Sequence, residues 1–179
     1  NEPHPQVMRA AIWLAAVRPG FLSVTVVAVL IGTACAWHAG DPFSFGIAAL
    51  TLLGAVCAHA GANVLNDYHD AANGSDGLNT LRIGPFTGGS RMIQDGLMSA
   101  DQTATLGALL MIATSITGLA LVVETGPGLL AIGAIGLLLG WGYSAPPLAL
   151  MSRGLGEWAV GASWWLVTIG SAWVQHGRI

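Results

Sequence analysis

Five long apolar stretches dominate the sequence and constrain its fold more than any other feature. A transmembrane helix needs about 20 mostly apolar residues. The stretches that approach or reach this length run over about 21–39, 43–66, 104–123, 128–142 and 158–174. Only 8% of the 179 residues are charged, whereas a soluble domain carries roughly 25%. We therefore predict an all-α integral membrane protein in a lipid bilayer, and we exclude a soluble domain, a disordered chain and a nucleic-acid binder.

Small residues in these stretches indicate that the helices pack closely against one another. The chain contains 25 glycines, and small residues let helix backbones approach in lipid. Gly54, Ala58 and Ala62 recur every four residues in the second stretch, and Gly136 and Gly140 form a GxxxG pattern in the fourth. These patterns predict a multi-span helical bundle and carry no chemistry of their own.

The arginines predict the orientation of the bundle, because cytoplasmic loops collect Lys and Arg. The chain has no lysine, and five of its six arginines fall on one side of the five predicted spans: Arg9, Arg18, Arg82, Arg91 and Arg153. We therefore expect a protein of the cell (inner) membrane whose N-terminus and long polar loop 67–103 are cytoplasmic.

A polar stripe interrupts the second apolar stretch near its cytoplasmic end. Its members are spaced by four, three and four residues, so they share one helix face: His59, Asn63, Asn66 and Asp70. Asp67 lies one step around the same helix, and Gly74 is expected to end it. Polar residues inside a membrane span are costly and point to function, although a hydrogen-bonded structural role remains the more frequent one for His59.

Three aspartates follow at the end of this stripe and suggest a magnesium site. Asp67, Asp70 and Asp76 have no Lys or Arg among them, and carboxylates this close repel one another without a cation. Oxygen ligands suit Mg²⁺, which is commonly held by one or two carboxylates and the phosphates of a substrate. Arg82 and Arg91 come later in the same loop and would bind phosphate oxygens. The alternative, that the aspartates only cap a helix end, is strongest for Asp76.

The motifs in this region resemble the UbiA superfamily of membrane prenyltransferases. Asn66-Asp67-Tyr68-His69-Asp70, followed by Asn73-Gly74-Ser75-Asp76, is similar to the first aspartate-rich motif of that superfamily. Further similarity, to the menaquinone-pathway branch that prenylates 1,4-dihydroxy-2-naphthoate, lies in Arg82-Ile83-Gly84-Pro85, Tyr143-Ser144-Ala145-Pro146-Pro147 and Arg153-Gly154-Leu155-Gly156-Glu157.

The resemblance implies a prenyltransferase in which Mg²⁺, bound by Asp67, Asp70 and Asp76, grips a polyprenyl diphosphate. It implies that five residues bind the diphosphate: Asn63, Asn66, Arg82, Arg91 and Arg153. Asp67, Asp70 and Arg82 would act in catalysis. Tyr143 would stabilise the allylic cation through its ring face, and an electron-rich aromatic acceptor would attack that cation.

The sequence also departs from the family pattern, and other functions stay open. The resemblance implies about nine spans and a second aspartate-rich motif, whereas this chain has about five spans and no such second motif. We therefore expect the chain to be one truncated prenyltransferase domain that is inactive alone. Alternative acceptors are hydroxybenzoate, homogentisate, a heme or a glycerol phosphate. A metal-transport or assembly subunit is a further alternative, disfavoured because the acids cluster at one membrane surface.

Overall fold

The computed structural model describes residues 5–74, 83 and 89–176, and this part of the chain is helical without any β-strand. The helices are α1 (Pro5–Ala16), α2 (Pro19–His38), α3 (Phe45–Asn73), α5 (Ala100–Thr125), α6 (Leu129–Gly142) and α7 (Gly156–His176), with a 3₁₀ helix, η1 (Met151–Arg153), before α7. The predicted all-α fold class is confirmed.

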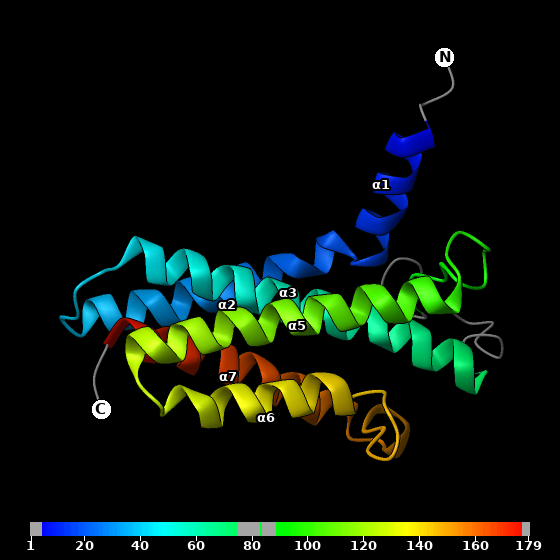
Figure 1. Ribbon diagram of the computed structural model, residues 1–179. Coiled ribbons are helices and arrows are strands. Elements are labelled where there is room, and N and C mark those ends of the chain that lie inside the picture. Colours follow the sequence, from blue (N-terminus) through cyan, green and yellow to red (C-terminus); the bar gives the residue numbers. More distant parts are fainter. Residues whose placement is uncertain (1–4, 75–82, 84–88, 177–179) are drawn as a thin grey trace.

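The five long helices run up and down in one bundle, and α1 projects away from it (Figure 1). α3 packs mainly against α5, and α2 packs mainly against α7. The start of α2, the end of α3, the start of α5, the end of α6 and the start of α7 lie at the same end of the bundle (Figure 1). The sequence separates these segments widely, so it is the alternating direction of the helices that gathers the polar motifs.

Three of the helices are long and apolar enough to cross a membrane: α2, α3 and α5. α6 is also apolar, but it has only 14 residues. α7 occupies the range of the fifth predicted span and has 21 residues. A crossing by α6 and α7 therefore stays a prediction from the sequence.

α3 is longer than the apolar stretch that predicts it. Ser44 begins the helix by accepting a hydrogen bond from the backbone N–H of Ile47. The helix continues through the aspartates to Asn73 and ends at Gly74, whose φ of 80° suits a residue without a side chain. At the other border of the loop, Ser99 and Gln102 form a capping box for α5. Residues 67–73 and 100–103, at the borders of the predicted loop, are thus helical.

Glycines allow two close helix contacts in this bundle. A methyl group at Gly32 of α2 would lie 2.1 Å from the carbonyl oxygen of Thr168 in α7. A methyl group at Gly54 of α3 would lie 2.6 Å from the hydroxyl of Thr117 in α5. The prediction that Gly54 lies in a packing face agrees with this contact. At Gly136, by contrast, an added methyl group would have no described atom within 4 Å.

Candidate active site

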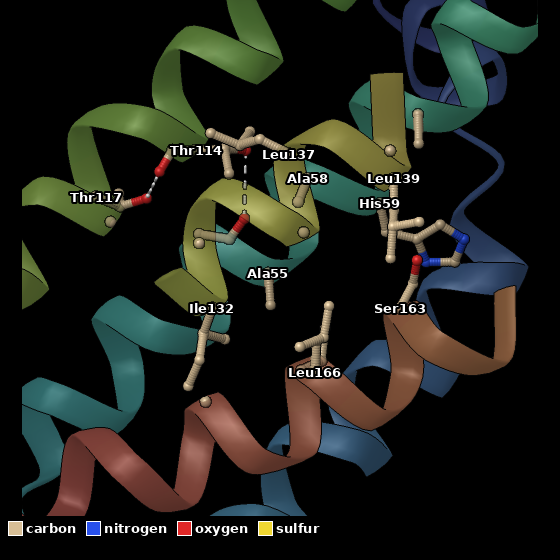
Figure 2. A pocket seen from close by; sticks show the side chains of 18 of the residues that line it. Ala55, Ala58, His59, Thr114, Thr117, Ile132, Leu137, Leu139, Ser163 and Leu166 are labelled. Atoms are coloured by element: carbon tan, nitrogen blue, oxygen red, sulfur yellow. Dashed lines mark hydrogen bonds between the residues drawn. The ribbon is translucent and has the colours of Figure 1, made fainter. Parts of the chain in front are cut away.

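A cavity of about 810 Å³ lies among the five long helices. Its polar end is lined by side chains from the motif end of the bundle: Arg18, Asn63, Asn66 and Tyr143. Away from that end the lining becomes mostly apolar, with a few Ser and Thr hydroxyls, and Figure 2 shows Ala55 of α3, Ile132 of α6 and Leu166 of α7 around it. The cavity therefore combines a polar mouth with a long apolar interior.

Asp67 is an acid of the motif that is held from two segments of the chain. Its side chain is 3% exposed and forms an ion pair with the guanidinium of Arg18. The backbone N–H of Ser90 donates to its Oδ1 at 3.1 Å, and the Ser90 hydroxyl donates to its Oδ2. Both carboxylate oxygens thus have partners, one from the start of α2 and one from the segment before α5.

Arg18 itself occupies the sharp corner between α1 and α2. Its φ of 55° and ψ of 64° are left-handed, and Pro19 begins the next helix. Arg18 lines the cavity, and its Nε–H is a buried donor without a hydrogen-bond partner among the described residues. Such a donor beside a polar cavity suits an anionic ligand. Sequence reasoning used Arg18 for the orientation of the bundle and missed its pairing with Asp67.

Asp70 and Asn66 form a second buried pair, one helical turn apart. The Asn66 amide donates to Oδ2 of Asp70 at 2.9 Å, and both residues are buried. Asn63, one turn further into the bundle, donates to the carbonyl of Val17 at 3.3 Å. The polar stripe is therefore real in the structure: its asparagines line the cavity, and Asp70 contacts the cavity wall through Asn66.

His59 continues this stripe below the polar mouth. Its Nδ1 lies 2.9 Å from the hydroxyl oxygen of Thr25, which is fully buried in α2. The rings of His59 and Trp164 of α7 pack edge to face, with 4.9 Å between their centroids and 79° between their planes. The imidazole lines the cavity with its orientation fixed from two helices.

Tyr143 lines the cavity from the end of α6. Burial raises the pKa of its phenol, and the negative charges of Asp70 and Glu157 raise this pKa further. The phenol is therefore neutral at physiological pH. The ring lies close to Gly156, where an added methyl group would be 3.7 Å from the phenol oxygen.

The remaining residues predicted for the site are not brought to the cavity or cannot be placed. Nε of Arg91 lies 3.9 Å from Oδ1 of Asp95, and the guanidinium of Arg153 donates to the carbonyl of Pro147 at 2.7 Å. Neither arginine is among the described residues that line the cavity. Asp76 and Arg82 lie outside the described residues.

The described residues offer donors suited to Mg²⁺ but do not complete a site. No group of three or more His, Cys, Asp or Glu side chains in the described ranges is arranged to hold a metal ion. Asp70 and the amide oxygen of Asn66 are hard oxygen donors of the kind that Mg²⁺ prefers. The Asp67 oxygens are engaged by Arg18 and Ser90, and Oδ2 of Asp70 accepts from the Asn66 amide. The donor chemistry fits a magnesium ion held partly by substrate.

Comparison with known proteins identifies the family. The model of the UbiA prenyltransferase family matches residues 11–179. The chain belongs to the UbiA prenyltransferase family. Family membership and the apolar helices together make it an integral membrane protein.

Relatives of this UbiA chain carry names from naphthoate prenylation. It is 30% identical to the 1,4-dihydroxy-2-naphthoate octaprenyltransferase of Escherichia coli over 95% of this chain and 55% of the relative. It is 32% identical to the enzyme of that name from Mycobacterium tuberculosis, over 84% and 49% respectively. It is 28% identical to a Synechocystis 2-carboxy-1,4-naphthoquinone phytyltransferase, over 82% and 45%.

The chain thus spans about half the length of the curated relatives it matches. No solved structure matches it significantly.

Proposed function

We propose that the protein transfers a polyprenyl group from a polyprenyl diphosphate to 1,4-dihydroxy-2-naphthoate, as a step of menaquinone biosynthesis. The observation that carries this proposal is the cavity, whose polar mouth contains Arg18 and Asn66 and whose apolar interior is large enough for an isoprenoid tail. The names of the three relatives described above refer to naphthalene-ring substrates and support the choice of acceptor.

The polar mouth would bind the diphosphate. Asp70 and the Asn66 amide oxygen would hold Mg²⁺ together with the diphosphate oxygens, and Asp76 is proposed as a further ligand. When bound, Mg²⁺ supplies positive charge that stabilises the departing diphosphate. The unpartnered Nε–H of Arg18 would donate to a diphosphate oxygen.

The role of Asp67 follows from its contacts. Because Arg18 and Ser90 occupy both of its oxygens, we assign it the task of holding Arg18 at the mouth. A direct bond from Asp67 to the metal would require Arg18 to move away. Arg82, Arg91 and Arg153 remain proposed diphosphate ligands, and for the last two this requires a rearrangement of the contacts described above.

The cavity walls would protect and orient the reacting carbon. An apolar interior excludes water, which would otherwise capture an allylic cation. The neutral phenol of Tyr143 presents an aromatic ring at the mouth, where its face would stabilise positive charge at that carbon. The acids of the motif, Asp67 and Asp70, lie together at one end of the bundle, which does not suit a metal pathway across the membrane. We also propose that the protein lies in the cell (inner) membrane with the motif end facing the cytoplasm, because the arginines gather on that side.

The test is prenyl transfer by the full-length protein in proteoliposomes. The vesicles receive a polyprenyl diphosphate, dihydroxynaphthoate and Mg²⁺, and the product is measured by mass spectrometry. The Asp70→Ala variant should lose about 10²-fold or more of the rate, as expected for one strong electrostatic contact. The rate should fall more than substrate binding does, because the contact strengthens as the diphosphate leaves.

A matched control is Asp101→Asn, which changes an exposed aspartate at the start of α5. This variant should keep the wild-type rate. Absence of product with the wild-type protein would refute the proposed reaction. A wild-type rate for Asp70→Ala at limiting Mg²⁺ would refute the assigned role of Asp70.

A further inference from the structure

His59 is the one cavity-lining residue in the described part of the chain whose side chain can accept a proton from a bound ligand. The other titratable side chains that line the cavity are Arg18 and Tyr143, both at the polar mouth. Arginine stays protonated, and the phenol of Tyr143 is neutral because its pKa is raised. The lining residues of α5 and α7 are all non-titratable.

The depth of His59 places it at the border between the two parts of the cavity. Seven residues separate it from Asn66, which corresponds to about 10 Å along a helix. Towards the mouth α3 presents Asn63 and Asn66, and in the other direction it presents Ala58 and Ala55. A diphosphate bound at Asn66 and Asp70 would leave its first carbon, and the ring that attacks this carbon, between the mouth and the depth of His59.

The contacts of His59 fix its ring and leave one nitrogen for a ligand. Nδ1 is engaged by Thr25 at 2.9 Å, and Trp164 packs edge-to-face against the ring. The hydrogen bond of His59 to a described residue uses Nδ1 and not Nε2. A side chain held from two neighbouring helices is pre-organised, so little of its freedom is lost when it binds a ligand.

We propose that His59 binds a ring hydroxyl of the aromatic acceptor through Nε2 and accepts its proton during prenyl transfer, with Nδ1–H donating to Thr25. This inference rests on the proposed function and adds the residue that activates the acceptor. Thr25 acts as a positioning residue: its hydroxyl lies at Nδ1 and can accept from Nδ1–H in the tautomer whose Nε2 carries the lone pair.

The proposed step balances in atoms and electrons. The hydroxyl proton moves to Nε2, and the electron pair left on oxygen drives a ring carbon to bond the first prenyl carbon. The bond from that carbon to the diphosphate breaks, and its electron pair leaves with the diphosphate. The ring carbon then loses its original substituent, a proton or CO₂, and keeps the bonding pair. The ring oxygen recovers its proton from the imidazolium, which becomes neutral again.

The experiment compares His59→Gln with wild type in the full-length protein, using prenyl transfer to dihydroxynaphthoate. We expect kcat/KM for the acceptor to fall about 10²-fold, within the range of general base catalysis, while KM for the polyprenyl diphosphate stays unchanged. The acidic limb of the pH–rate profile, where the imidazole is protonated, should disappear. The control His38→Gln changes an exposed histidine at the end of α2 and should behave as wild type.

Two further measurements keep the outcomes distinct. Thr25→Val removes the hydroxyl but keeps the shape, so it should lower kcat/KM for the acceptor by a smaller factor. If His59→Gln does not accumulate in the membrane, Thr25→Val decides, and an unchanged kcat/KM then overturns the inference. An active wild-type enzyme with an unchanged His59→Gln rate or pH profile also overturns it. A wild-type protein without transfer activity would instead refute the proposed function.

Discussion

The Arg18–Asp67 ion pair should stabilise the fold even when no metal or substrate is bound. The Asp67→Ala variant removes the carboxylate and leaves the Arg18 guanidinium, together with the N–H and hydroxyl of Ser90, without their acceptor. Removing one partner of a buried ion pair costs about 3–5 kcal/mol. Because the Arg18 side chain keeps 19% exposure and reaches water, we expect the lower end, about 3 kcal/mol.

The assay is reversible unfolding by SDS in mixed micelles, without Mg²⁺, followed by the fluorescence of the seven tryptophans. A double-mutant cycle with Arg18→Met and Asp67→Leu isolates the pair. The double variant should be more stable than the sum of the two single losses predicts, because it leaves no unpaired charge. Asp95→Ala, at an exposed carboxylate in the segment before α5, serves as control and should change stability by less than about 1 kcal/mol.

A loss of stability in Asp67→Ala below about 1 kcal/mol would refute this reasoning. A loss that appears only when Mg²⁺ is present would refute it as well. The second result would mean that Asp67 serves the metal, and that its contacts with Arg18 and Ser90 do not hold the corner between α1 and α2.

Three further predictions concern packing, orientation and the isolated chain. Gly32→Ala should destabilise the protein by about 1–3 kcal/mol, because its methyl group would meet the α7 backbone. The measurement is the same SDS titration, with Gly46→Ala as a neutral control, since no atom lies near an added methyl group there. Equal effects of the two variants would contradict the close contact at Gly32. In a cysteine-free background, Asp95→Cys should react with an impermeant maleimide from the cytoplasmic side of vesicles and Glu124→Cys from the other side; the reverse pattern would overturn the orientation. Residues 1–179 alone should give no prenylated product in detergent with Mg²⁺ and both substrates, because only one aspartate-rich motif is present in them. Product formation would show either that a second motif is dispensable or that two copies assemble into one site. Cross-linking of the same sample would separate these two cases.

The periodicity of the sequence determined most of the local structure. Each apolar stretch overlaps one of the five long helices, although α3 extends seven residues beyond its stretch. The spacing of His59, Asn63 and Asn66 placed them on one face that lines the cavity, and Gly74 marked the end of α3. These features depend only on residues close in sequence, and the geometry of a single helix fixes them.

The tertiary structure alone decided which groups meet across helices. Arg18 pairs with Asp67 from 49 positions away, and Thr25 reaches His59 from 34. No pattern within either segment encodes such a pairing, because it depends on how α2 packs beside α3. Apart from the Gly136 and Gly140 pattern, the apolar walls that α5, α6 and α7 add to the cavity also carry no motif. Hydrophobic residues on these helices look alike whether they face lipid or a cavity, so only the packed bundle shows which of them surround the site.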